Sequence, residues 1–125
     1  MASPRSTGAR SLVVDDDNLV RSVVRAALER LGHTVTEAAD RETAVAASAH
    51  TGFDLVIIDA RMPGLSLRET LARIRTALAP RVPLLLVISG APVEPDLLAE
   101  YGAAYLAKPV DLHDLMSAAR EAGAS

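Results

Sequence analysis

Short apolar runs alternate along the chain with segments whose apolar residues recur at helical spacing. The three strongest runs are residues 11–14, 55–58 and 84–88. After the first run, apolar residues recur at positions 20, 23, 24, 27, 28 and 31, a spacing that places them on one face of a helix. Gly32 follows, at the position where glycine commonly ends a helix. The pattern therefore predicts a buried strand followed by an amphipathic helix.

The rest of the chain continues this alternation. Strands are predicted over residues 33–37, where apolar and polar residues alternate, and over residues 104–106. Further helices are predicted over residues 41–49, 66–78, 96–100 and 112–119. Five strands that are each followed by a helix imply a parallel sheet with right-handed crossovers.

The strands differ in a way that predicts their order in the sheet. The first, third and fourth are apolar throughout, as strands covered on both faces must be. The second and fifth are alternating or short, which is typical of edge strands. The predicted fold is therefore α/β, a doubly wound five-stranded parallel sheet of order 2-1-3-4-5 with helices on both faces.

The composition limits the classes of protein and of site. With 125 residues, half of them hydrophobic, the chain has room for one domain with its own core. One Phe, two Tyr and no Trp leave that core to aliphatic side chains. The absence of cysteine excludes disulfides, thiolate metal sites and a cysteine nucleophile, and it fits the cytoplasmic location that we expect.

We expect the domain to span residues 10–122, with a flexible N-terminal tail over residues 1–9 and a C-terminal tail over residues 123–125. Residues 1–9 lack the apolar run of a secretory signal, and the run at 84–88 is too short to cross a bilayer. A net charge of −3 gives no general footprint for nucleic acid. Neither a membrane nor a nucleic acid is therefore expected as a direct partner.

Polar residues end the apolar runs. Asp15 and Asp16 follow the first strand, and Asp59, Ser89 and Lys108 follow the third, fourth and fifth. The carboxyl ends of parallel strands meet at one edge, where ligands bind in open α/β sheets. Carboxylates gathered there repel one another unless a cation neutralises them, and Mg²⁺ suits oxygen ligands and a phosphate. The set predicts a phosphoryl-transfer site with Asp59 as nucleophile.

Four segments carry a family resemblance. Residues 12–17 (LVVDDD), 54–64 (DLVIIDARMPG), 87–90 (VISG) and 105–109 (YLAKP) resemble, in order, the signature segments of bacterial response-regulator receiver domains. The resemblance covers about residues 10–122, and four segments in register are far more specific than one. It implies the flavodoxin-like receiver fold and a signalling domain that catalyses only its own phosphorylation and dephosphorylation.

The resemblance also implies roles for the acidic residues. Asp59 would accept the phosphoryl group from a histidine kinase or a histidine phosphotransfer protein. Asp16, Asp59 and the backbone carbonyl of Arg61 would ligate Mg²⁺, and Asp15 would help through water. An output partner and an oligomeric state do not follow from the resemblance.

The other signature residues are assigned in the same way. Ser89 and Lys108 would contact the phosphoryl oxygens, and Tyr105 matches the aromatic residue that changes rotamer when the Ser89 hydroxyl is drawn toward the phosphate. The peptide bond before Pro109 is usually cis in the family.

Three departures from the family pattern affect the loops. Leu67 stands where the family commonly has glycine, and Arg61 occupies a position that tunes the access of water to the acyl phosphate. Only 18 residues separate Ser89 from Lys108, and they include two prolines. Because proline cuts a helix short, we expect a short fourth helix and an atypical output surface.

Two other functions stay open at this point. Asp15 and Asp17 also fit the Asp-x-Asp of haloacid-dehalogenase-type phosphatases, although the later acidic motif of those enzymes is not matched. A pseudo-receiver would keep the fold as a binding module without phosphorylation.

Simpler roles are expected for several polar residues. Asp17 is predicted to cap the first helix. His33, His50 and His113 lack ligand spacing and are expected at the surface or in packing. Arg21 and Arg25 are interpreted as solvated charges, on the helix whose exposed side docks kinases in similar domains.

Overall fold

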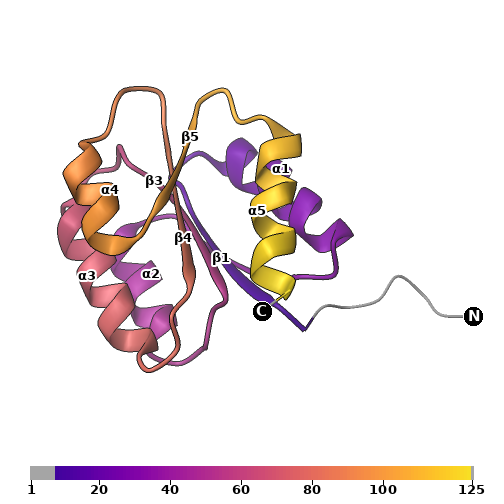
Figure 1. Cartoon of the computed structure of the whole chain (residues 1–125), viewed down its shortest axis with the longest axis horizontal. Helices are drawn as coiled ribbons and strands as arrows, with labels where there is room; N and C mark the ends of the chain where they lie inside the picture. The colour runs from indigo at the N-terminus through magenta and orange to yellow at the C-terminus, as the bar shows by residue number, and fades with distance from the viewer. Residues whose placement is uncertain (1–7, 125) are drawn as a thin grey trace, which may run out of the picture.

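A computed structural model describes residues 8–124 of the chain, and within them five strands alternate with five helices (Figure 1). The strands are β1 (Arg10–Val14), β2 (Thr34–Ala38), β3 (Leu55–Asp59), β4 (Leu84–Ser89) and β5 (Ala104–Ala107). The helices are α1 (Asn18–Arg30), α2 (Arg41–Ser48), α3 (Leu67–Leu78), α4 (Pro95–Tyr101) and α5 (Leu112–Ala124). The predicted strands and helices are all present, with their ends shifted by a few residues.

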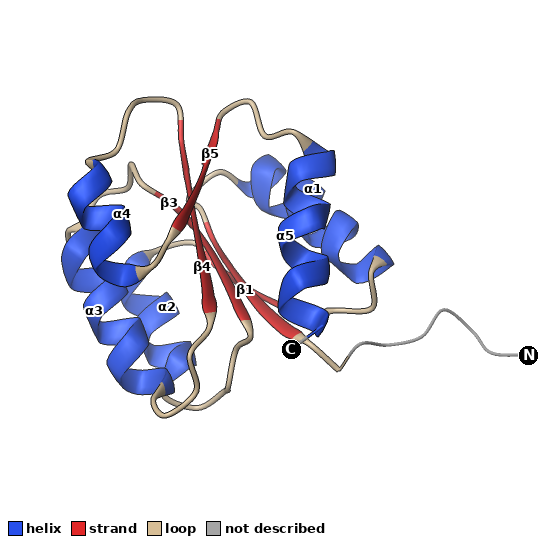
Figure 2. Cartoon of the chain, viewed as in Figure 1, coloured by secondary structure: helices blue, strands red, loops and turns tan. Residues whose placement is uncertain are grey.

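The strands form one parallel sheet in the order β2-β1-β3-β4-β5, as the sequence predicted. Helices α1 and α5 cover one face, and α2, α3 and α4 cover the other (Figures 1 and 2). The apolar strands β1, β3 and β4 lie inside the sheet, because only there are both faces of a strand shielded from water. The edge strand β5 stays largely exposed.

Alternate residues of each inner strand serve the two faces. In β3, Leu55 and Ile57 pack in the cluster that includes residues of α1 and α5, whereas Val56 and Ile58 pack in the cluster that includes residues of α2 and α3. All four are at most 2% exposed. Burial of each such side chain contributes about 1.5–3 kcal/mol, so these two layers fix β3 and the Asp59 that ends it.

Local signals set the helix ends. The Asp17 side chain accepts hydrogen bonds from the backbone N–H groups of residues 19 and 20, which confirms it as the cap of α1. Ser66 and Glu69 form a capping box at the start of α3. Gly32 has φ 86°, the left-handed conformation that glycine adopts after a helix.

Helix α4 has seven residues, so the prediction of a short fourth helix is confirmed. Pro95 is its first residue, where a missing N–H costs no helical hydrogen bond, and Gly102 ends it in the left-handed conformation. Proline therefore determines where this helix begins.

The two tails fall only partly within the described residues. Residues 1–7 and 125 lie outside them. Ala9, expected in the N-terminal tail, is buried, and its carbonyl accepts a hydrogen bond from the backbone N–H of Thr34. Helix α5 continues to Ala124, past the expected boundary at residue 122. In the described part of the chain, no helix combines the length and apolar character needed to span a membrane.

His33 is a packing residue. It is 4% exposed, and its ring joins Ser11 Oγ at 2.5 Å to the backbone carbonyl of Ala119 at 3.0 Å. Because the carbonyl can only accept, Nε2 donates to it and the neutral ring accepts from the Ser11 hydroxyl at Nδ1. Burial lowers the pKa of His33, which favours this neutral form.

Candidate functional site

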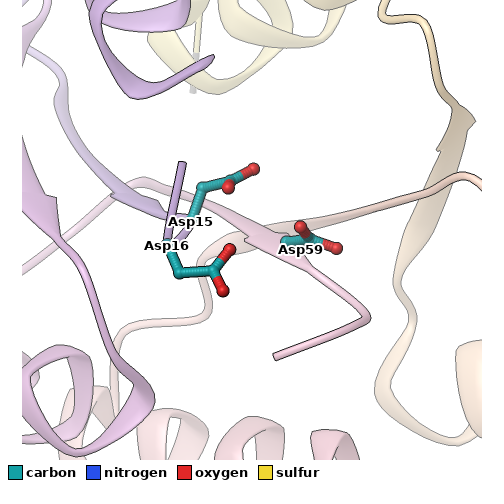
Figure 3. Close-up of side chains that lie close together, drawn as sticks. All are labelled: Asp15, Asp16 and Asp59. Carbon is teal, nitrogen blue, oxygen red and sulfur yellow. The ribbon is translucent and has the colours of Figure 1, made fainter. Parts of the chain in front are cut away.

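Three carboxylates meet at the carboxyl edge of the sheet (Figure 3). Asp15 and Asp16 follow β1 directly, and Asp59 ends the neighbouring strand β3. One carboxylate oxygen of each residue lies within 4.8 Å of the other two. Asp15 and Asp59 are buried whereas Asp16 is exposed, so the cluster has a protein-lined floor and an open side.

Lys108 brings a positive charge to this cluster from the loop after β5. Its Nζ lies 2.8 Å from Asp59 Oδ2 and 3.5 Å from Asp15 Oδ2. Burial alone would lower the pKa of Lys108, but the hydrogen bond that its ammonium group donates to Asp59 and the charges of both carboxylates raise the pKa above its ordinary value. The ammonium group therefore stays charged. It belongs to the only lysine in the sequence.

The backbone around Lys108 holds it in place. Its N–H donates to the Ser89 carbonyl at 2.9 Å, which joins the end of β5 to the end of β4. The bond between Lys108 and Pro109 is cis, in agreement with the family resemblance. A second cis bond, before Pro80, was not expected from the sequence.

The two buried carboxylates also accept hydrogen bonds from the backbone. Asp59 Oδ1 accepts from the N–H of Arg61, and Asp15 Oδ1 accepts from the N–H of Asp17, both at 2.9 Å. Burial raises the pKa of Asp15; the hydrogen bond from Asp17 opposes this rise, and the charge of Asp59 adds to it. Ionised Asp15 is therefore held in an unfavourable environment.

Ser89 ends β4 and Tyr105 lies on β5, and the side chains of both contact the start of the loop that follows β4. Ser89 is 1% exposed, and its Oγ accepts from the N–H of Ala91 at 3.1 Å. The Tyr105 hydroxyl donates to the carbonyls of Ser89 and Ala91 at 3.3 and 3.4 Å. Tyr105 is 37% exposed, so it is not a core residue. Both predicted switch residues therefore contact one loop.

Two arginines hold the backbone beneath the acidic side chains, and the sequence indicated neither. Arg21, interpreted as solvated, is largely buried: its Nη1 donates to the Asp15 carbonyl at 2.5 Å and its Nε pairs with Glu37 at 3.1 Å. Arg41 donates to the carbonyls of Asp59 and Ala60 at 3.0 and 2.9 Å. Arg25, partly exposed, also pairs with Glu37, so neither charge on α1 is free in solvent.

The donor set fits a hard divalent cation. All the side-chain ligands are carboxylate oxygens, which Mg²⁺ prefers, and the open side leaves room for water and a phosphate. One ammonium group neutralises only one of the three carboxylates, so a net negative charge remains for a cation to balance. The observed residues therefore have the chemistry and the charge of a Mg²⁺ site.

We predict that Asp15→Asn stabilises the metal-free protein by about 1 kcal/mol, the usual size of a single-residue effect. Because the folded-state pKa of Asp15 is raised, its contribution to stability is complete below the ordinary value of 3.8 and is lost as the pH rises through the raised pKa. Asparagine can still accept from Asp17 but carries no charge. Urea denaturation of both proteins at several pH values, in EDTA and then in millimolar Mg²⁺, measures the change in stability and its dependence on pH.

The variant should also remove part of the pH dependence of unfolding above pH 3.8. Addition of millimolar Mg²⁺ should reduce the difference in the free energy of unfolding between the variant and the wild type, because the cation relieves the same repulsion in the wild-type protein. A less stable variant in the absence of metal would contradict the unfavourable environment assigned to Asp15.

The fold and the acidic edge together define a class, the flavodoxin-like α/β domains that bind ligands at the carboxyl ends of their strands. Within this class the chain belongs to the response regulator receiver domains, whose family model matches residues 11–120.

Individual relatives agree with this assignment. The transcriptional regulatory protein TcrA of Mycobacterium tuberculosis is 35% identical over 120 residues, covering 95% of this chain and 47% of TcrA. The sensor histidine kinase AruS of Pseudomonas aeruginosa is 35% identical over 120 residues, covering 91% of this chain and 12% of AruS. A crystal structure of a CheY-like receiver domain protein from Methanospirillum hungatei superimposes with a TM-score of 0.84 at 27% identity, covering 94% of each chain. The chain thus spans about half the length of TcrA and far less of AruS.

Proposed function

We propose that this domain accepts a phosphoryl group on the carboxylate of Asp59 from a histidine kinase or a histidine phosphotransfer protein, and then signals to a partner. One observation carries the proposal: a buried carboxylate at the edge of the sheet bonds to Lys108 at 2.8 Å and shares its pocket with two further carboxylates. A solely structural ion pair needs one carboxylate, not three.

The transfer step follows from the groups around Asp59. A carboxylate oxygen attacks the phosphorus of a phosphohistidine; the new O–P bond forms as the P–N bond breaks, and the imidazole leaves and takes up a proton. Lys108 would move its hydrogen bond from Asp59 to a phosphoryl oxygen, and the N–H of Arg61 would keep the carboxylate oriented. Water attacks the phosphorus of the acyl phosphate; the bond between phosphorus and the Asp59 oxygen breaks, inorganic phosphate leaves and the carboxylate is restored.

Asp16 and Asp59 with the backbone carbonyl of Arg61 would hold Mg²⁺, and Asp15 would bind it through water. The ion supplies charge neutralisation for the phosphoryl oxygens. Most of the catalysis in such a transfer is positioning and electrostatic stabilisation, which the rigid ends of β1 and β3 are suited to provide.

The signal would pass through Ser89 and Tyr105. In the structure the Ser89 hydroxyl oxygen accepts from the N–H of Ala91. A phosphoryl group on Asp59 would offer an acceptor to which this hydroxyl could donate. A turn of Ser89 would rearrange the loop whose carbonyls accept from Tyr105, and this would bias two states of that ring. The short α4 neighbours this loop, so the partner's contacts there are expected to differ from those in other family members.

An apolar hollow next to Lys108 suits the phosphodonor. It has a volume of about 370 Å³ and lies between α1 and the loop after β5. Its exposed apolar residues include Leu19, Val23 and Leu112, which are 72%, 46% and 44% exposed. The exposed side of α1 is where the family resemblance places kinases, so a donor whose apolar helix packs there would bring its histidine near the acidic site.

The phosphodonor and the output depend on the whole protein. A segment similar to this chain occurs in TcrA, which is named as a transcriptional regulatory protein, and in AruS, which is named as a sensor histidine kinase. We propose a role in a two-component phosphorelay, which both contexts share.

Titration with Mg²⁺ and beryllofluoride tests the proposal. Millimolar Mg²⁺ should raise the melting temperature, because repulsion among the carboxylates is relieved only in the folded state, and beryllofluoride should raise it further. No shift with either would favour a pseudo-receiver. Acetyl phosphate labelling followed by peptide mapping locates the phosphoryl group: labelling of Asp15 instead of Asp59 would favour phosphatase chemistry.

A further inference from the structure

Arg41 is a buried charged side chain that the transfer step above does not use. It is the first residue of α2 and is only 2% exposed, although arginine is rarely buried so completely without a charged partner. Asp40 caps the helix beside it through the N–H of Thr43 and makes no ion pair with it.

The guanidinium group spans both ends of the loop between β3 and α3. Its Nη2 donates to the carbonyls of Asp59 and Ala60, where the loop begins, and its Nη1 donates to the carbonyl of Leu65 at 2.5 Å, just before the cap of α3. A planar fork with several donors is suited to bridging three carbonyls in this way.

One of these hydrogen bonds continues to the phosphoacceptor. The peptide unit whose carbonyl accepts from Arg41 at Ala60 is the same unit whose N–H, at Arg61, donates to Asp59 Oδ1 at 2.9 Å. A peptide unit is planar, so fixing its carbonyl fixes the direction of its N–H. The cation also polarises the unit, which strengthens the hydrogen bond to the carboxylate.

The neighbouring peptide unit is held from both sides as well. The Asp59 carbonyl accepts from Arg41, and the N–H of Ala60 donates to the Ile88 carbonyl of β4 at 2.8 Å. Two successive peptide units next to the phosphoacceptor are therefore held between a buried cation on one side and β4 or the carboxylate on the other.

A contribution to stability does not by itself explain why an arginine is buried at position 41. No ion pair joins Arg41 to a carboxylate among residues 8–124, and its Nε is buried without a hydrogen-bond partner. A buried charge without a paired anion is costly. The contacts instead converge on the loop that carries Asp59 and Arg61.

We propose that Arg41 is a positioning residue that fixes the peptide units around Asp59 so that its carboxylate and the Arg61 backbone face the cation pocket. The proposal rests on the proposed function, because the pocket is the one assigned there to Mg²⁺. Arg41 acts through the backbone and does not touch the phosphoryl group.

The test compares Arg41→Met, which keeps the length of the side chain but has no donor, with Arg41→Lys, which keeps the charge but loses the planar fork. Ile74→Val, in the core on the same side of the sheet, is the control for a general loss of stability. Calorimetric titration with Mg²⁺ and the amide NMR signal of Arg61 in metal-free protein are measured for each.

Mg²⁺ should bind Arg41→Met about 10- to 100-fold more weakly, the usual effect of removing a group that orients a metal ligand. Arg41→Lys should lie between this variant and the wild type, and Ile74→Val should match the wild type. The metal-free Arg61 amide should shift upfield and exchange faster in Arg41→Met, change less in Arg41→Lys and stay unchanged in Ile74→Val. Wild-type affinity and an unchanged amide in a folded Arg41 variant would overturn the proposal.

A measurement on the wild-type protein tests the proposal if the Arg41 variants fail to fold. The Arg41 Nε–H signal should shift in step with Mg²⁺ saturation, and a signal that stays unmoved while Mg²⁺ binds by calorimetry would overturn the proposal. Failure of the proposed function looks different. In that case the wild-type protein itself would bind no Mg²⁺, whereas the Arg61 amide would still respond to the loss of Arg41.

Discussion

Asp59→Asn should abolish the acid-labile phosphoryl label that acetyl phosphate and Mg²⁺ introduce into the wild-type protein. An amide is a poor nucleophile and cannot pair as an anion with Lys108, whose Nζ lies 2.8 Å from the carboxylate. Because the remaining oxygen can still accept from Arg61, the fold should persist. Intact-mass spectrometry at neutral and acidic pH measures the label.

Asp54→Asn is the matched control for this change. Asp54 lies just before the opposite end of the same strand, where it accepts from the Arg10 N–H and pairs with Arg81. This variant should be labelled like the wild type. Full labelling of Asp59→Asn, or loss of the label from both variants, would remove the assignment of Asp59 as phosphoacceptor.

Lys108→Met should slow phosphorylation by acetyl phosphate about a hundredfold, the usual cost of removing one group that stabilises charge in a transition state. It should also destabilise the metal-free protein by about 2 kcal/mol, because the carboxylate of Asp59 is left buried without its cation. The partial exposure of Lys108 keeps this cost below that of a fully buried pair.

Lys108→Met should raise the Mg²⁺ affinity, although it lowers the rate of phosphorylation and the stability. The metal and the ammonium group compete for the same carboxylates, so Lys108→Met should bind Mg²⁺ about tenfold more tightly at low ionic strength. Lys108→Arg, which keeps the charge, should retain wild-type Mg²⁺ affinity more closely. Weaker Mg²⁺ binding by Lys108→Met would contradict the competition inferred from the geometry.

Parallel topology explains why the acidic site could be predicted from the sequence. Once apolar runs define strands of one direction, Asp15, Asp59 and Lys108 must reach the same edge, wherever they lie in the chain. Helix caps were equally predictable, because Asp17 and Gly32 act on neighbouring backbone. Such features depend on local chemistry or on the order of the strands.

Side-chain direction across layers could not be predicted in the same way. Arg41 is the first residue of a helix, and the periodicity of that helix does not indicate that its side chain reaches three carbonyls of another segment. The direction of the Arg21 side chain depends on its ion pair with Glu37 of β2. His33 bonds to the Ala119 carbonyl, 86 positions away in sequence. These contacts form between layers that pack together, so no local sequence pattern predicts them.

The presence of a single lysine gives the pocket a built-in reporter. Isotopic labelling of lysine would mark one ammonium group in the chain, the one held between Asp15 and Asp59. Its resonance would follow the occupancy of the pocket directly, free of overlap from other side chains. An amine-directed reagent would find no other lysine in this sequence, so the protection of Lys108 from acylation would record how long its ammonium group stays paired with a carboxylate or a phosphoryl oxygen.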